Sequence, residues 1–161
     1  MNSSSLMDLA VLVSALGCGL MAGFFFAFSV LVMKALGAIQ PAHGISAMQS
    51  INVAVINPWF LTPFLGMVVL SVLLSIAAVL RWHEPGAGYV VAGGLFYFLG
   101  TFLVTMLFNV PRNNALAAVA ATSTEGAALW ADYLIAWTKW NHVRTIAALA
   151  GAASFTIALV R

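Results

Sequence analysis

An arginine, an amide and several aromatic side chains share one helical face near the last apolar run of the chain. On a helix that turns by about 100° per residue, Trp137, Asn141 and Arg144 fall on the same side. A guanidinium stabilises charge that develops on an oxygen atom, and an indole supplies a flat apolar wall. The same face also carries Trp130, Tyr133, Trp140 and Ala148. This pattern predicts a functional site with Arg144 and Asn141 as candidate catalytic residues.

Arg144 has two interpretations, and His142 is a third candidate. An ionisable residue inside a membrane span is costly and therefore indicates a functional site, whereas an arginine near the end of a span often only reaches for the lipid headgroups. His142 points about 160° away from Arg144 on the same helix. A straight helix cannot direct both side chains into one narrow pocket, which ranks Arg144 and Asn141 above His142.

Asparagines also surround Pro111, at the end of the preceding apolar run. Proline disfavours helix at the residue before it, so we expect the helix to break or kink there. Asn109 and Asn113 have two interpretations: they bond the carbonyls freed at the break, or they belong to a site together with Arg112.

A third polar group lies in the connection between the first two apolar runs. Residues 45–56 predict an amphipathic helix whose apolar stripe contains Gln49 and Asn52. These amides are either incidental or directed inward to bond a partner. Asn57 before Pro58 predicts a helix start, with Asn57 as the cap. The candidate substrate-binding residues are Trp137, Trp140, Asn113, Asn109, Asn52, Gln49 and Trp59.

The elements that must position these residues are membrane helices. Of 161 residues, 63% are hydrophobic and only 6% charged, whereas soluble domains carry about 25% charged residues. Apolar runs at 6–33, 59–80, 89–110 and about 143–160 predict four spans, of which the first is retained rather than cleaved. We expect an all-α, up-and-down bundle forming a single domain over 1–161, with an extra amphipathic helix in the first long loop. Its long first and third connections then share one membrane side.

Composition also excludes several classes of function. The net charge is only +2, without a Lys/Arg tract, so we expect no nucleic-acid partner. Cys18 stands alone, and His43, His83 and His142 all lie outside the middle of a span, so we expect no metal site, no haem and no other cofactor. Gly19 and Gly23 form a GxxxG, which fits close helix packing within the chain or in a homo-oligomer.

Residues 19–29, 47–60, 109–116 and 137–145, in this order, resemble the anthrone oxygenase-like family of four-helix integral membrane proteins. The resemblance spans nearly the whole chain, and most members are uncharacterised bacterial proteins. Fungal members oxidise anthrones to anthraquinones with molecular oxygen and no known cofactor. Many members have a histidine three residues before the motif arginine, whereas this chain has Asn141 there and His142 one place later.

Three functions compete on these grounds. The first is a membrane oxygenase or oxidoreductase that acts on a lipophilic phenol- or anthrone-like aromatic without a cofactor. The second is a non-enzymatic binding or transport protein for a small lipophile, and the third is an accessory subunit of a membrane complex. The expected partners are the lipid bilayer and a small lipophilic aromatic or quinone-like ligand. We expect an integral protein of the bacterial cytoplasmic (inner) membrane.

Overall fold

The computed structural model describes residues 3–161, and its regular elements in that range are all helical. Three short stretches are π-helical, meaning that their hydrogen bonds skip one more residue than in an α-helix. The elements are α1 (Ser3–Ala27), π-helix η1 (Phe28–Val32), α2 (Met33–Gly37), α3 (Pro41–Ala54), α4 (Pro58–Leu80), α5 (Ala87–Leu95), π-helices η2 (Phe96–Leu103) and η3 (Thr105–Asn109), α6 (Val110–Ala117) and α7 (Thr124–Leu159).

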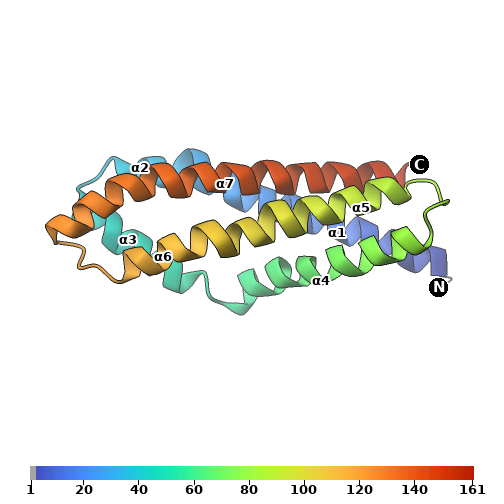
Figure 1. Cartoon of the computed structure of the whole chain (residues 1–161), viewed down its shortest axis with the longest axis horizontal. Coiled ribbons are helices and arrows are strands. Elements are labelled where there is room, and N and C mark those ends of the chain that lie inside the picture. Colours follow the sequence, from blue (N-terminus) through green and yellow to red (C-terminus); the bar gives the residue numbers. More distant parts are fainter. Residues whose placement is uncertain (1–2) are drawn as a thin grey trace.

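Four continuous helical stretches are long and apolar enough to cross a membrane: Ser5–Gly37, Pro58–Leu80, Ala87–Ala117 and Thr124–Leu159. They run up and down, and the start of α1 and the end of α7 lie at one end of the bundle (Figure 1). The tight turn at 81–86 lies at that same end, while α3 and the loop after α6 lie at the other. These observations confirm the four-helix membrane bundle with an extra helix in the first long loop.

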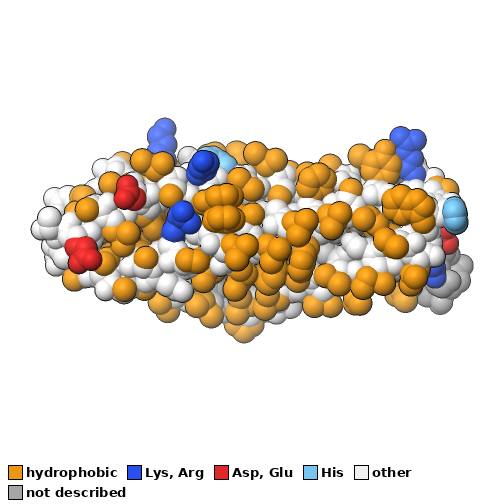
Figure 2. Space-filling view, in the orientation of Figure 1, with side chains coloured by type: hydrophobic (Ala, Val, Ile, Leu, Met, Phe, Trp, Pro, Cys, Tyr) orange, Lys and Arg blue, Asp and Glu red, His pale blue; other side chains and the backbone are white. Residues whose placement is uncertain are grey.

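The fourth helix is much longer than the expected span of about 143–160. α7 has 36 residues, or about 54 Å at ~1.5 Å per residue, against a hydrocarbon core of ~30 Å. Its first half exposes Glu125, Asp132 and Lys139, which belong in water. Figure 2 shows acidic and basic side chains towards both ends of the molecule, with a broad apolar band between them. We call α2, α3, α6 and residues 124–139 the head of the molecule, because they extend beyond that band.

The third helix continues through Pro111, so the expected break does not occur. Instead, the chain winds into the wider π-helical turns of η2 and η3 before the proline. Arg112 Nη1 donates to the carbonyl of Phe108 at 2.6 Å and thus provides a side-chain partner for a carbonyl in the turn that contains the proline. A change of helical register and one side-chain bond therefore accommodate a residue that lacks an N–H.

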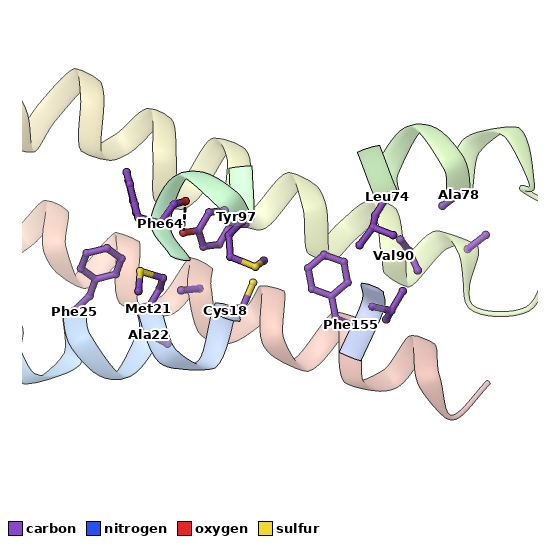
Figure 3. Packing of buried hydrophobic residues seen from close by; sticks show 14 residues of the cluster. Cys18, Met21, Ala22, Phe25, Phe64, Leu74, Ala78, Val90, Tyr97 and Phe155 are labelled. Atoms are coloured by element: carbon purple, nitrogen blue, oxygen red, sulfur yellow. Dashed lines mark hydrogen bonds between the residues drawn. The ribbon is translucent and has the colours of Figure 1, made fainter. Parts of the chain in front are cut away.

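Small residues allow close packing in the interior of the bundle. A Cβ atom added at Gly151 would lie 3.2 Å from Cys18 Sγ and 3.4 Å from the carbonyl of Gly93. Figure 3 shows this region of the core, where the Tyr97 hydroxyl donates to the carbonyl of Phe64 at 3.1 Å. Added Cβ atoms at Gly19 and Gly23, by contrast, would meet nothing within 4 Å. That pair faces outward, and its role between chains stays a prediction.

Candidate functional site

Arg144 is buried in the bundle with a side-chain exposure of only 5%. Its Nη2 donates to Asn141 Oδ1 at 2.6 Å, and its Nη1 donates to Thr105 Oγ1 at 3.3 Å. Its Nε makes no hydrogen bond within the described chain. The guanidinium carbon lies 4.4 Å from the centroid of the Phe25 ring and 5.1 Å from that of Trp137. The cation is thus held by neutral groups and aromatic faces.

No carboxylate neutralises this charge among residues 3–161. The ion pair that the described chain contains joins Arg81 to Glu84, 4.0 Å apart in the short turn at the other end of the bundle. Burying a charged group away from water costs roughly several kcal/mol per ion, unless a partner of opposite charge compensates it. An unneutralised buried guanidinium is therefore strongly attractive to an anionic or electron-rich group.

Asn141 holds the guanidinium in place. Its Nδ2 donates to the carbonyl of Phe25 and to Ser29 Oγ, both at 2.6 Å, so its Oδ1 must face Arg144. Phe25 precedes η1 and Ser29 lies within it, while Thr105 opens η3. The arginine is therefore fixed between two π-helical segments, and such segments occur frequently at functional sites.

Arg144 and Trp137 line a cavity of about 420 Å³ that extends from the bundle towards the head. α1, α3, α4, α7 and the third helix all contribute to its wall. The aromatic rings of Phe24 and Phe60 lie 4.9 Å apart and join the α1 and α4 sides. The six aromatic side chains in the wall are Phe24, Phe25, Phe28, Phe60, Phe64 and Trp137. This wall suits a flat apolar ligand.

The polar part of the wall is formed by hydrogen-bond donors rather than by acids. The described residues that line the cavity include no Asp, Glu, His or Lys. Besides Arg144, the lining contains Asn52 and Asn113. Asn52 Nδ2 is buried without a hydrogen-bond partner in residues 3–161. The cavity therefore combines an aromatic wall, a cation and amide donors, which fits a ligand with electronegative oxygen.

The mouth of the cavity is apolar. Val53, on the last turn of α3, and Ile56, in the loop after it, line the cavity and are 74% and 71% exposed. Leu65 and Met106 line it from α4 and η3 and are also exposed. A lipophilic ligand can pass such a mouth without leaving apolar surroundings.

Gln49 joins α3 to the end of α6, beside the cavity. Its Nε2 donates to the carbonyls of Leu116 and Val119 at 2.8 and 3.1 Å, at the end of α6. We expect Gln49→Leu to lower the free energy of unfolding by about 1–3 kcal/mol, since two net hydrogen bonds are lost. Thermal unfolding in detergent measures this. Ser50→Ala is the matched control, because the hydroxyl of Ser50 donates to the carbonyl of Ser46 within its own helix. An equal loss in both variants would contradict the role of Gln49.

Five of the ten sequence-predicted residues line the cavity, and a sixth, Asn141, orients Arg144. The five are Arg144, Trp137, Asn113, Asn52 and Gln49.

The other four lie elsewhere. Trp59 is 91% exposed, and His142 is exposed on α7. Trp140 stacks on Phe108 with ring centroids 3.6 Å apart. Asn109 is buried and donates to the carbonyl of Trp137 at 3.1 Å, so it joins the third and fourth helices.

Sequence reasoning missed the α1 wall of the cavity and the contact of Arg144 with Thr105. The run of phenylalanines at 24–28 was the available signal, because three of its rings, those of Phe24, Phe25 and Phe28, line the cavity. Nothing in the local sequence indicated Thr105, since a lone threonine in an apolar helix usually bonds its own backbone. Thr105 does both: it donates to the carbonyl of Thr101 at 2.7 Å and accepts from Arg144.

Fold and site together define a four-helix membrane protein with an unneutralised arginine facing an aromatic cavity. The sequence model of the family described as anthrone oxygenase matches residues 57–154, which is more than half of the chain. The chain belongs to the anthrone oxygenase family. Comparisons with curated proteins and with solved structures found no match. Among residues 3–161, no three His, Cys, Asp or Glu side chains lie close enough together to hold a metal ion.

Proposed function

We propose that this protein is a membrane-bound oxygenase that oxidises a lipophilic phenol- or anthrone-like aromatic in the cavity beside Arg144. The observation that carries the proposal is the buried guanidinium, which faces an aromatic cavity without a carboxylate partner in the described chain. Membership of the anthrone oxygenase family supports an oxygenase-like role at the level of the family. We further propose the bacterial cytoplasmic membrane as its location.

The cavity matches such a substrate in size and polarity. Its volume of about 420 Å³ lies within the range of roughly 300–1,000 Å³ that is usual for small-molecule sites. A tricyclic aromatic would lie against Phe25, Phe28 and Trp137, with its oxygen towards Arg144. Asn141 is a positioning residue here, because it holds the guanidinium through Oδ1.

The proposed chemistry needs only the substrate and molecular oxygen. Loss of a proton from the CH₂ group of an anthrone gives an enolate, whose charge on oxygen is stabilised by Arg144. The anionic carbon then transfers electrons to O₂ and forms a C–O bond, which gives a hydroperoxide after protonation. Loss of water cleaves the O–O bond and leaves a second carbonyl. In balance, one CH₂ group and one O₂ become one C=O group and one water, so no external reductant or cofactor is consumed.

The cavity wall offers no carboxylate or imidazole as a base among the described residues. In this scheme the substrate's proton therefore passes to water, and the protein contributes by favouring the anion. The same observation favours one alternative: a protein that binds or carries a small lipophile without changing it.

Oxygen uptake with anthrone distinguishes the two. We expect the purified protein in detergent to consume one O₂ per anthraquinone formed, with an ¹⁸O atom from ¹⁸O₂ in the new carbonyl. Detergent micelles alone and heat-inactivated protein are the controls, because anthrones also oxidise spontaneously. Saturable anthrone binding without acceleration over those controls would reject the oxygenase and leave the binding protein.

A further inference from the structure

Asn113 accepts two hydrogen bonds on a single atom. The Tyr133 hydroxyl donates to Asn113 Oδ1 at 2.7 Å, and Trp137 Nε1 donates to the same atom at 2.8 Å. Tyr133 and Trp137 also stack on each other, with ring centroids 6.0 Å apart. Two aromatic side chains from the head portion of α7 thus hold the amide in place through hydrogen bonds.

These bonds determine which way the amide points. An indole N–H can only donate, so the atom that faces Trp137 must be the amide oxygen. The nitrogen of Asn113 therefore points the other way, and it makes no hydrogen bond within residues 3–161. Asn113 is a residue of the cavity wall. Its two N–H groups are donors whose orientation is fixed and which have no partner in the described chain.

This second donor lies close to Arg144. Both groups contact the same indole: the guanidinium carbon lies 5.1 Å from the ring centroid of Trp137, and Asn113 accepts from its N–H. Both groups therefore flank the same side chain in the wall of the cavity. Asn52 Nδ2, buried without a partner in the described chain, adds a further donor from α3 to the same cavity.

We propose that Asn113 binds a second oxygen of the ligand and thereby selects aromatic ketones or enolates that carry an oxygen substituent beside the oxygen held by Arg144. The inference rests on the proposed function for the class of ligand, but it concerns binding and not turnover. Tyr133 and Trp137 are positioning residues for this donor, because they prevent the amide from rotating.

Binding of inert ketones tests the proposal independently of catalysis. The probes are 9-fluorenone, its 1-methoxy derivative with the added oxygen beside the carbonyl, and its 3-methoxy derivative with the added oxygen remote from it. None of the three has a CH₂ group to oxidise. We expect the full-length protein in detergent to bind the 1-methoxy compound about three- to tenfold more tightly than the other two, which corresponds to one added net hydrogen bond.

Asn113→Asp is the decisive variant, because a carboxylate keeps both acceptor positions for Tyr133 and Trp137 and removes the N–H donors. We expect it to bind all three probes with equal affinity. Because all three probes are neutral, the ratio of their affinities is independent of the effect of the new negative charge on Arg144. Ala115→Asp, which places the same charge on an exposed position of α6, should keep the wild-type ratio. Tyr133→Phe should retain part of the preference, since Trp137 still holds the amide.

The outcomes separate this proposal from the oxygenase. A preference for the 1-methoxy compound that Asn113→Asp abolishes supports the second binding position, even if oxygen uptake is absent and the oxygenase proposal fails. Equal binding of the three probes by the wild type overturns it, and so does an unchanged preference in a folded Asn113→Asp protein, even where oxygen uptake is observed.

Discussion

Arg144→Lys should yield a folded protein whose rate of anthrone oxidation is about 10²–10³-fold lower than that of the wild type, the loss typical of removing one oxyanion donor. Lysine keeps the positive charge but loses the planar fork that reaches Asn141 and Thr105 together. It also loses the flat contact with the rings of Phe25 and Trp137. Oxygen uptake, corrected for spontaneous oxidation, measures the rate.

Arg112→Lys is the matched control. It makes the same chemical change at an arginine that bonds the carbonyl of Phe108 and does not line the large cavity. We expect its turnover to stay within about threefold of the wild type. If Arg144 only joins helices, Arg144→Lys should unfold at a lower temperature and keep its turnover. Equal loss of turnover in both variants would show that the guanidinium of Arg144 has no special role.

Most of the fold can be predicted from the sequence because its causes are local. Uninterrupted apolar runs identify the four helices, and the Asn57-Pro58 pair marks a start where Asn57 Oδ1 indeed accepts from the amide of Phe60 at 3.1 Å. The expected span at about 143–160 covers only the later part of α7. The same helix extends through the head, where Trp130 and Tyr133 are buried.

The candidate site can be predicted only in part, because it is assembled from separate helices. Helical periodicity correctly grouped Trp137, Asn141 and Arg144, which share one helix. It could not show that the Asn141 amide would bond the carbonyl of Phe25, more than a hundred residues away. Trp59 was selected for its residue type alone, and its outward direction depends on how α4 packs against its neighbours.

The π-helical segments explain why the directions of side chains on the third helix were harder to predict than the residue types that form the site. A change from α to π winding rotates every later side chain relative to the expected wheel. Pro111 indicates an irregularity in the helix. The helix does not break there, because the wider π-helical turns of η2 and η3 accommodate the proline. Thr105 and Asn109 consequently face α7, where Thr105 meets Arg144 and Asn109 meets the carbonyl of Trp137.

Asn141→Asp should abolish most of the activity, by at least about 10²-fold, although the two side chains have nearly the same shape. The new carboxylate would pair with Arg144 at the place where Asn141 Oδ1 now accepts at 2.6 Å. A guanidinium neutralised within the protein has little attraction left for a substrate enolate. Measuring turnover together with the binding of a phenolate probe checks both consequences.

The direction of this effect distinguishes an anion-binding arginine from a structural one. If Arg144 only held helices together, a carboxylate would be its better partner, and Asn141→Asp should remain active. Because the variant also loses the donations to Phe25 and Ser29, Ser29→Ala serves as the control: it removes one of these bonds without adding charge. We expect Ser29→Ala to retain at least about a fifth of wild-type turnover, the cost of roughly one net hydrogen bond. An active Asn141→Asp protein with intact phenolate binding would remove the unneutralised cation from the mechanism.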